Sequence, residues 1–176
     1  GLKVYKSLSA IPHEVELVVC CITAESVPAL VKEAGKKGSS GMIIISSGFN
    51  EIGNTQLTLQ LEKAIHENPK ISVIGPNCLG VLDTRSGVDT LFLPNYRMER
   101  PHPGKISFIS QSGALGSAIL DWASFKEYGI SKFISFGNAT QTDEADLLEY
   151  LGNDTDTLVI AVYVEGFKNG KKFFEI

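Results

Sequence analysis

Short apolar runs alternate with amphipathic segments along most of the chain. Residues 16–22 (ELVVCCI) are rich in β-branched side chains and almost continuously apolar, which is typical of a strand buried on both faces. Residues 26–36 follow with their apolar side chains spaced along one side of a helix, and residues 42–45 return to the strand pattern. Residues 54–68 and 71–74 repeat the order of helix and then strand. This alternation predicts a parallel sheet flanked by helices.

A proline-rich segment interrupts this rhythm and predicts a linker. Residues 94–103 (PNYRMERPHP) contain three prolines and side chains of both charges. After them the strand pattern returns at 105–110, and helical spacing follows over 113–126. The same order continues through four further segments, namely 132–135, 143–151, 158–164 and a helix from Asn169. We therefore expect a second α/β unit after the linker.

Composition narrows the class of protein. The chain has 176 residues, of which 43% are hydrophobic and 20% are charged, as in ordinary globular proteins. Its net charge of −4 disfavours nucleic-acid binding through a basic face, and its apolar runs fall short of the roughly 20 residues that cross a bilayer. Three cysteines without a CxxC spacing favour a reducing compartment. We expect a cytoplasmic protein without nucleic-acid or membrane partners, and both ends interrupt the α/β pattern as in a fragment.

The turn SQSGALG, residues 110–116, joins a predicted strand to a predicted helix. Free N–H groups and the helix dipole favour an anion at such a start, and a glycine at position 113 lets a ligand approach the backbone. Ser112 suits either a helix cap or a hydrogen bond to phosphate. An ordinary cap with small residues for close packing explains the same pattern. A hydrolase nucleophile at Ser112 is disfavoured, because the G-x-S-x-G pattern is absent.

Three other loops follow predicted strands, at residues 23–28 (TAESVP), 46–53 (SSGFNEIG) and 75–80 (GPNCLG). Ligands of open parallel sheets bind at these carboxyl ends, although ordinary caps and turns look the same. Cys78 is a candidate nucleophile, but free cysteines more often pack in a core. Glu165 also ends a strand, where a solvated carboxylate is ordinary. Surface positions are expected for the three histidines, namely His13, His66 and His102. The residues alone indicate two α/β units with anion-binding loops and no particular reaction.

Five stretches carry a resemblance through their order and spacing, namely ELVVCCITAESVP, IISSGFNEIG, VIGPNCLGV, GKISFISQSGALGSAILDWA and SFGNATQTDEADLLEYL. Together they resemble the α-type part of the nucleoside-diphosphate-forming acyl-CoA synthetases. This family includes ADP-forming acetate–CoA ligases and is related to succinyl-CoA synthetase. The resemblance implies an α/β fold with parallel sheets. A partial Rossmann-like CoA-binding domain would span 1–93, a linker 94–103, and a partial flavodoxin-like ligase domain 104–176.

The resemblance also implies a reaction and its residues. The family converts acyl-CoA, ADP and phosphate reversibly into a carboxylic acid, CoA and ATP, through an acyl phosphate and a phosphohistidine. The implied CoA contacts are Thr23, Ala24, Ser47, Gly48 and Phe49. The implied phosphate site is Ser112, Gly113 and Ala114. The implied catalytic residues are Asn77, near the thioester, and Glu165, which would orient the phosphohistidine.

Parts of the family pattern are not found in this sequence. The family's Gly-rich CoA loop is expected before residue 1 and its nucleophilic histidine beyond Ile176, so no histidine here is assigned to catalysis. ATP or ADP with Mg²⁺ is expected on an ATP-grasp β-part, either a separate subunit or a fused domain. This chain alone is expected to be inactive, and the complete protein is expected to be an oligomer that acts on an acyl-CoA and its carboxylic acid.

Two other classes of function fit parts of the sequence. A non-catalytic regulatory module that binds CoA or acyl-CoA, of the kind fused to an acetyltransferase, would share the same stretches. A nicotinamide dehydrogenase would share a Rossmann-like beginning, but it gives the second unit and the SQSGALG helix no role.

Overall fold

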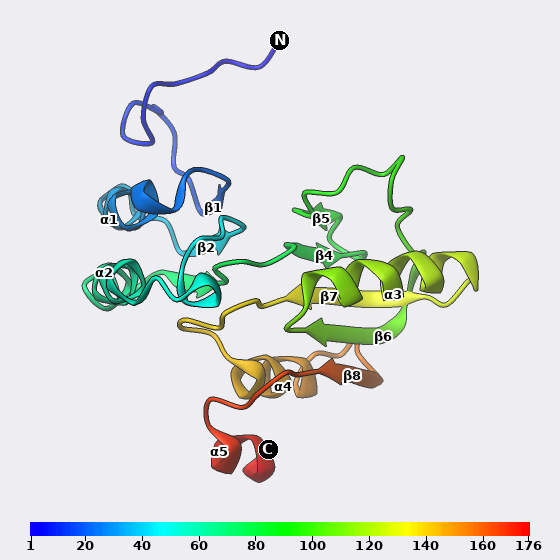
Figure 1. Cartoon of the computed structure of the whole chain (residues 1–176). Helices are drawn as coiled ribbons and strands as arrows, with labels where there is room; N and C mark the ends of the chain where they lie inside the picture. The colour runs from blue at the N-terminus through cyan, green and yellow to red at the C-terminus, as the bar shows by residue number, and fades with distance from the viewer.

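The computed structural model describes residues 1–176 and contains two sheets (Figure 1). The first sheet has the order β1-β2-β3, and all its pairs are parallel. Its elements are β1 (Leu17–Cys20), α1 (Val27–Lys37), β2 (Gly41–Ile44), α2 (Thr55–His66) and β3 (Ser72–Ile74). Both helices bury their apolar sides against this sheet in one hydrophobic core. The short 3₁₀ helices η1 (Ala24–Ser26) and η2 (Asn50–Ile52) follow β1 and β2.

The second sheet has the order β5-β4-β7-β6-β8. Its strands are β4 (Val81–Asp83), β5 (Val88–Asp89), β6 (Pro103–Ser110), β7 (Ile130–Ser135) and β8 (Val159–Tyr163). Strand β6 pairs in parallel with β7 and β8, whereas β4 runs antiparallel to β5 and β7. The α/β expectation is therefore confirmed, but the second sheet is mixed rather than purely parallel.

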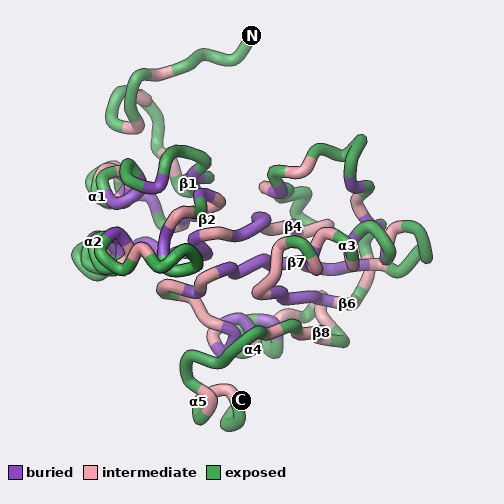
Figure 2. Tube along the Cα trace, viewed as in Figure 1, coloured by how far each residue is buried: buried purple, intermediate pink, exposed green.

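Helices cover the two faces of the second sheet. Helix α3 (Gly113–Phe125) packs with Phe108 and Phe133, while α4 (Glu144–Gly152) packs with the neighbouring residues Ile109 and Ile134. Because consecutive strand residues point to opposite faces, α3 and α4 lie on opposite sides of the sheet. The last element, α5 (Gly170–Glu175), follows β8. Figure 2 shows burial concentrated along the strands and the inner helix faces. No helix of the structure has both the length and the apolar character needed to cross a membrane.

Strand β1 departs from the sequence pattern. Its residues were expected to be buried on both faces, but Leu17 and Val19 are 43% and 42% exposed while Val18 and Cys20 are buried. The physical reason is that α1 and α2 cover only one face of this sheet. A continuous apolar run thus marks the strand without showing how many of its faces are covered.

Strand pairing divides the chain before the proline-rich segment, while the expected domain bounds of 1–93 and 104–176 stay a prediction. Strands β4 and β5 precede residue 93, yet β4 pairs with β7 of the second sheet. By strand pairing, the chain divides between Ile74 and Val81. The segment 94–102 instead runs along the second part, where the Arg100 guanidinium pairs with Asp89 at 2.7 Å. The antiparallel pairing of β4 joins residues about fifty positions apart, and local patterns do not reveal such partners.

The loop between β7 and α4 joins the two parts. In Figure 1 this loop extends from β7 toward the first sheet. The side chain of Gln141 bonds to the backbone of β3: its Oε1 accepts from the Val73 N–H at 2.6 Å, and its Nε2 donates to the Ile71 carbonyl at 3.2 Å. The loop therefore continues the hydrogen bonding of β3 and brings the ends of both sheets to one crevice.

Candidate functional site

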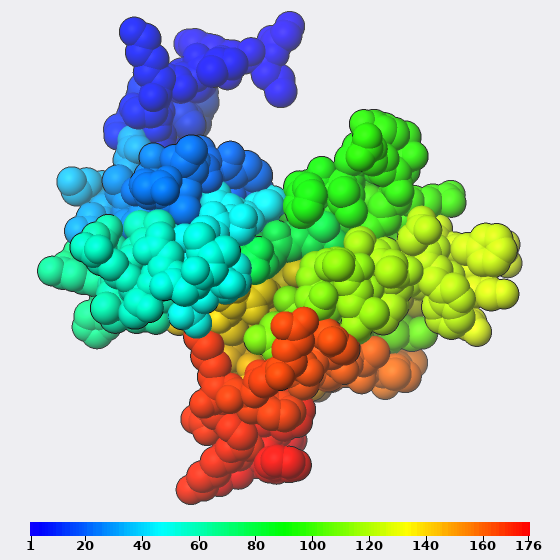
Figure 3. All heavy atoms as spheres, in the orientation of Figure 1, coloured from blue at the N-terminus to red at the C-terminus, as the bar shows by residue number.

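A cavity of about 780 Å³ lies between the two parts. It opens beyond the carboxyl ends of β1, β2, β3, β6 and β8, which is where ligands of open α/β sheets bind. In Figure 3 the molecule is hollowed between the blue-to-cyan first part and the green second part. The volume lies within the roughly 300–1,000 Å³ of small-molecule sites. All but two of the implied site residues line it, namely Thr23, Ala24, Ser47, Asn77, Ser112, Gly113, Ala114 and Glu165.

The start of α3 presents unpaired donors to this cavity. The Ser112 Oγ accepts from the Leu115 N–H at 3.4 Å and so caps the helix. The N–H groups of Gly113 and Ala114 make no hydrogen bond within the chain. An anion there gains about 0.3–1 kcal/mol from the helix dipole, and up to about 2 kcal/mol when partly buried. The arrangement can therefore bind a phosphate-sized anion, with further contacts needed for tight binding.

Helix α3 contains two glycines near its start, and packing requires only one of them to be glycine. A Cβ at Gly113 would lie 3.6 Å from the Cβ of Leu79, an ordinary contact, so packing does not require glycine there. A Cβ at Gly116 would lie 2.6 Å from the Phe133 ring, so packing does require glycine at that position. Close packing thus explains Gly116 but not Gly113, where the missing side chain leaves the N–H groups open to a ligand.

Gln111 ties the α3 start to the loop that carries Glu165. Its side-chain Oε1 accepts from the N–H groups of Glu165 at 2.7 Å and Gly166 at 3.3 Å. Its own N–H donates to the Tyr163 carbonyl at 3.0 Å. The exposed Glu165 is therefore held beside the anion site. Gln111 was not predicted as a site residue, although it lies inside the turn 110–116.

The turn after β3 holds Asn77 in a left-handed conformation, with φ of 59°. Gly75 before it has φ of 101°, and a Cβ there would lie 2.4 Å from the Ile44 carbonyl oxygen, so glycine is required. The Asn77 Nδ2 donates to the Oδ1 of Asn138 at 3.3 Å. Backbone strain of this kind concentrates at functional sites, where the surrounding structure maintains it.

Gly48 and Phe49, which were expected to contact CoA, are not among the residues that line this cavity. Phe49 is fully buried in the core of the first part. The Gly48 N–H donates to the Glu51 carboxylate, so it is not free for a ligand. Gly48 has φ of 116°, and a Cβ there would lie 3.0 Å from the Cβ of Ala24. Gly48 thus brings the loops at Ala24 and Ser47 close together, while Phe49 anchors the second loop in the core.

Cys78 and the imidazoles give no nucleophile in the cavity, whereas the exposed thiol of Cys21 lines it. Cys78 is buried, its Sγ donates to the Ile44 carbonyl at 3.2 Å, and burial raises the pKa of its thiol to about 12. Cys78 is thus neutral at physiological pH and packs as expected. Surface positions are confirmed for His13, His66 and His102, and none of them lines the cavity.

Several lining residues were missed by the sequence analysis, namely Cys21, Phe92, Leu93, Gln111 and Ser117. Phe92 and Leu93 reach the cavity because the β4–β5 hairpin turns the chain back, so that the Phe92 N–H donates to the Leu79 carbonyl at 3.3 Å. No local sequence signal marks that return.

The whole chain matches characterised relatives. It is 40% identical to an acetate–CoA ligase (ADP-forming) of Methanocaldococcus jannaschii and covers 24% of that protein. It is 38% identical to the alpha subunit of acetate–CoA ligase (ADP-forming) II of Pyrococcus furiosus and covers 38% of it. The chain belongs to the nucleoside-diphosphate-forming acyl-CoA synthetase family. It spans about a quarter to two-fifths of the length of these relatives, in the α-type part.

Family models and solved structures agree with this membership. A CoA binding domain model matches residues 1–84, and a model of a succinyl-CoA ligase like flavodoxin domain matches residues 103–176. A dinucleotide forming acetyl-coenzyme A synthetase from Candidatus Korarchaeum cryptofilum, in complex with phosphate and ADP, superimposes with a TM-score of 0.90 at 34% identity. That match covers 99% of this chain and 37% of the neighbour's chain.

Proposed function

We propose that this chain supplies the CoA- and phosphate-binding part of an ADP-forming acyl-CoA ligase. The complete ligase interconverts acyl-CoA, ADP and phosphate with a carboxylic acid, CoA and ATP. The observation that carries the proposal is the pair of free N–H groups at Gly113 and Ala114, which face the same cavity as the strand ends of a CoA-binding domain. An anion site and a CoA groove in one cavity are what attack of phosphate on a thioester requires.

In this proposal one side of the cavity binds phosphate and the other side binds CoA. Ser112, Gly113 and Ala114 bind phosphate through N–H groups and a hydroxyl, while Thr23, Ala24 and Ser47 line the CoA side. Gly48 and Phe49 shape the CoA side indirectly, by close approach and by anchoring the loop in the core.

Asn77 and Glu165 complete the site between these two sides. In this proposal the amide of Asn77, which lines the cavity, orients the thioester. The exposed Glu165 carboxylate is placed to orient an imidazole supplied from outside this chain, since no histidine here lines the cavity.

Nucleotide and Mg²⁺ are assigned to an ATP-grasp β-part. No cluster of three or more His, Cys, Asp or Glu residues in this chain could hold a metal ion. The relatives are much longer than this chain, which leaves room for such a part in the same polypeptide or in a partner subunit. The proposal places the assembled, oligomeric ligase in the cytoplasm, in keeping with its three unpaired cysteines.

The test is phosphate-dependent ATP formation by the full-length ligase, with acetyl-CoA as the acyl-CoA probe. ATP should form only when acetyl-CoA, ADP and phosphate are all present. Ser112→Ala should raise the KM for phosphate, whereas Ser124→Ala at the far end of the same helix should not. Tight CoA binding without any ATP formation would instead identify a regulatory module and overturn the proposal.

A further inference from the structure

The side chain of Asn138 bridges two loops of the candidate site. Asn138 follows β7 in the second sheet, but its Nδ2 donates to the Oε2 of Glu51 at 2.6 Å. Its Oδ1 accepts from the Nδ2 of Asn77 at 3.3 Å. One amide group therefore uses its donor on the CoA-side loop and its acceptor on the turn that carries Asn77. These partners lie 87 and 61 positions away in the sequence.

The backbone holds Asn138 firmly in this place. Its N–H donates to the Pro76 carbonyl at 2.9 Å, and the Thr140 N–H donates to the Gly75 carbonyl at 3.1 Å. Gly137 has φ of 54°, and a Cβ there would lie 2.3 Å from the Pro76 carbonyl oxygen. Only glycine fits so close a contact. The loop after β7 is thus fixed to the turn after β3, and the Asn138 amide has a defined direction.

Glu51 connects Asn138 to the CoA side of the cavity. Its carboxylate accepts from the N–H groups of Gly48 and Phe49, which follow the lining residue Ser47 directly. Partial burial alone would raise the pKa of the Glu51 carboxyl, but the hydrogen bonds from Gly48, Asn138 and the neighbouring backbone outweigh it, so the pKa is lowered. An ionised carboxylate only accepts hydrogen bonds, and the Asn138 amide supplies the donor from the second sheet.

We propose that Asn138 is a positioning residue, which holds the Ser47 loop in register with the Asn77 turn so that CoA and phosphate meet in one cavity. It acts through Glu51 and Asn77 and does not line the cavity itself. This inference rests on the proposed function. It assigns to the loop between β7 and α4 a role in the affinity for CoA.

The hydrogen bond from Asn138 to Glu51 can be tested in the full-length ligase by exchanging the donor and acceptor groups of the two side chains. Asn138→Asp places a carboxylate against Glu51 but still accepts from Asn77, so only the contact with the CoA-side loop is lost. The Kd for CoA and the KM for acetyl-CoA should rise at least about tenfold, while kcat changes by less than about threefold. In the double variant Glu51→Gln/Asn138→Asp, the introduced amide donates to the introduced carboxylate. Affinity for CoA should then return to within about threefold of the parent.

Controls separate this effect from folding and from failure of the proposed function. Asn153→Asp introduces the same charge at the exposed end of α4 and should leave both constants unchanged. Thermal unfolding of each variant reports the fold, and a loss of CoA affinity without a lower melting temperature excludes a merely unstable single variant. An active parent whose CoA affinity is unaffected by Asn138→Asp overturns the inference, as does an impaired single variant that the double variant does not rescue. A parent that binds CoA but forms no ATP contradicts the proposed function instead, and the Kd comparison still tests the bridge.

Discussion

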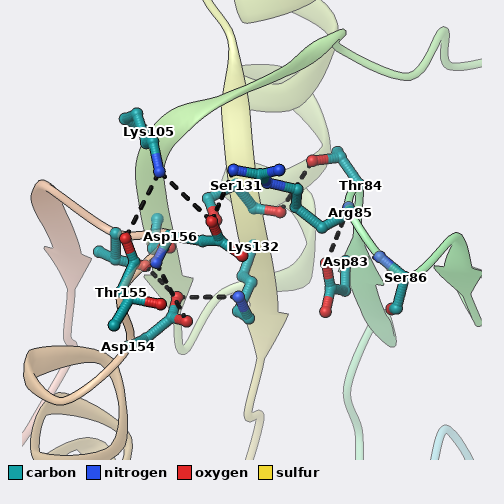
Figure 4. Close-up of polar contacts among 12 residues, drawn as sticks. Asp83, Thr84, Arg85, Ser86, Lys105, Ser131, Lys132, Asp154, Thr155 and Asp156 are labelled. Carbon is teal, nitrogen blue, oxygen red and sulfur yellow. Dashed lines mark hydrogen bonds and ion pairs between the residues drawn. The ribbon is translucent and has the colours of Figure 1, made fainter.

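Polar groups lie at both ends of the second sheet, but they are paired with one another at one end and unpaired at the other. At the amino ends of β6, β7 and β8, the charged side chains are paired with one another (Figure 4). The Lys132 ammonium lies 2.8 Å from the Asp154 carboxylate, while Asp156 pairs with Arg85 at 2.7 Å and with Lys105 at 3.3 Å. At the carboxyl ends, the α3 start instead presents N–H groups with no partner in the chain.

We infer from this difference that the amino ends of the strands contribute to stability, whereas the carboxyl ends are available to a ligand. Lys132 and Asp154 are nearly buried, with 9% and 14% of their side chains exposed, and the Thr157 hydroxyl also donates to Asp154 at 2.5 Å. Buried charges are tolerated when they are paired and hydrogen-bonded in this way. Donors left unpaired at the other end are available to a ligand.

The largest effect is expected at the unpaired end. Gly113→Asp places a carboxylate among the N–H groups that would bind phosphate, and the added Cβ meets only an ordinary contact with Leu79. ATP formation by the full-length ligase should fall at least about 100-fold, which is about 2.7 kcal/mol in transition-state stabilisation. Urea denaturation should show a stability change within about 0.5 kcal/mol, because Asp suits a helix start. Gly113→Ala is the control for size, and near-normal turnover of Gly113→Asp would refute the phosphate site.

At the paired end, the effect is expected on stability rather than on activity. Lys132→Ala leaves the Asp154 carboxylate nearly buried without its cation, and should lower the free energy of unfolding by about 1.5–3 kcal/mol. The Kd for CoA should not change. Arg85→Ala removes an ion-pair partner that is 54% exposed, so it should cost less than about 1 kcal/mol. Urea denaturation of both variants measures the contrast, and equal losses would contradict it.

The same pair predicts how stability depends on pH. The hydrogen bond from Lys132, followed by that from Thr157, lowers the pKa of Asp154 below its usual 3.8. Its stabilising contribution is therefore complete above the unfolded-state pKa and is lost as the pH falls through the lower folded-state pKa. The difference in unfolding free energy between the parent and Asp154→Asn should be largest near neutral pH and should shrink below about pH 4. Asp121→Asn, which removes a carboxylate from an exposed position of α3, serves as the control for the loss of one negative charge.

The smallest effect is expected at Ser131, whose buried hydroxyl at the paired end has no hydrogen-bond partner. The Ser131 Oγ is buried and has no hydrogen-bond partner, although the Ser131 carbonyl accepts from the Thr84 hydroxyl at 3.0 Å. Ser131→Ala removes the unsatisfied hydroxyl and leaves the carbonyl in place. The free energy of unfolding should stay the same or rise by up to about 1 kcal/mol. A clear loss in urea denaturation would show that the hydroxyl has a partner in solution.

The sequence predicted the elements well where their signals are local. The helix from Gly113 was expected from a serine cap followed by small residues, and α3 begins there with Ser112 as its cap. The order of strand, cap and helix also predicted which loops meet at one edge, and Thr23, Ser47 and Asn77 do line one cavity. The roles of these residues in catalysis remain predictions that rest on the family.

Residues whose role depends on distant partners were not predicted. Phe49 was expected at the CoA site but is a core residue, because a loop sequence does not show which way its apolar side chain turns. Asn138 gave no signal, since its partners Glu51 and Asn77 lie in another part of the chain. The apolar run of β1 likewise did not show that Leu17 and Val19, on one face of this strand, are partly exposed.

By itself, the sequence determined the alternation of strands and helices and the capped, glycine-containing start of α3. These features depend on side-chain periodicity and on hydrogen bonds within about four residues, and both are set by residues that are neighbours in the sequence. Only the tertiary structure decided that β4 belongs to the second sheet, that Gln111 holds the Glu165 loop, and that Asn138 joins the two halves of the cavity. The first two arrangements depend on which strands pair within the second sheet, and the third depends on how the two sheets pack side by side. In each case the groups that meet are about 50 or more positions apart in the sequence.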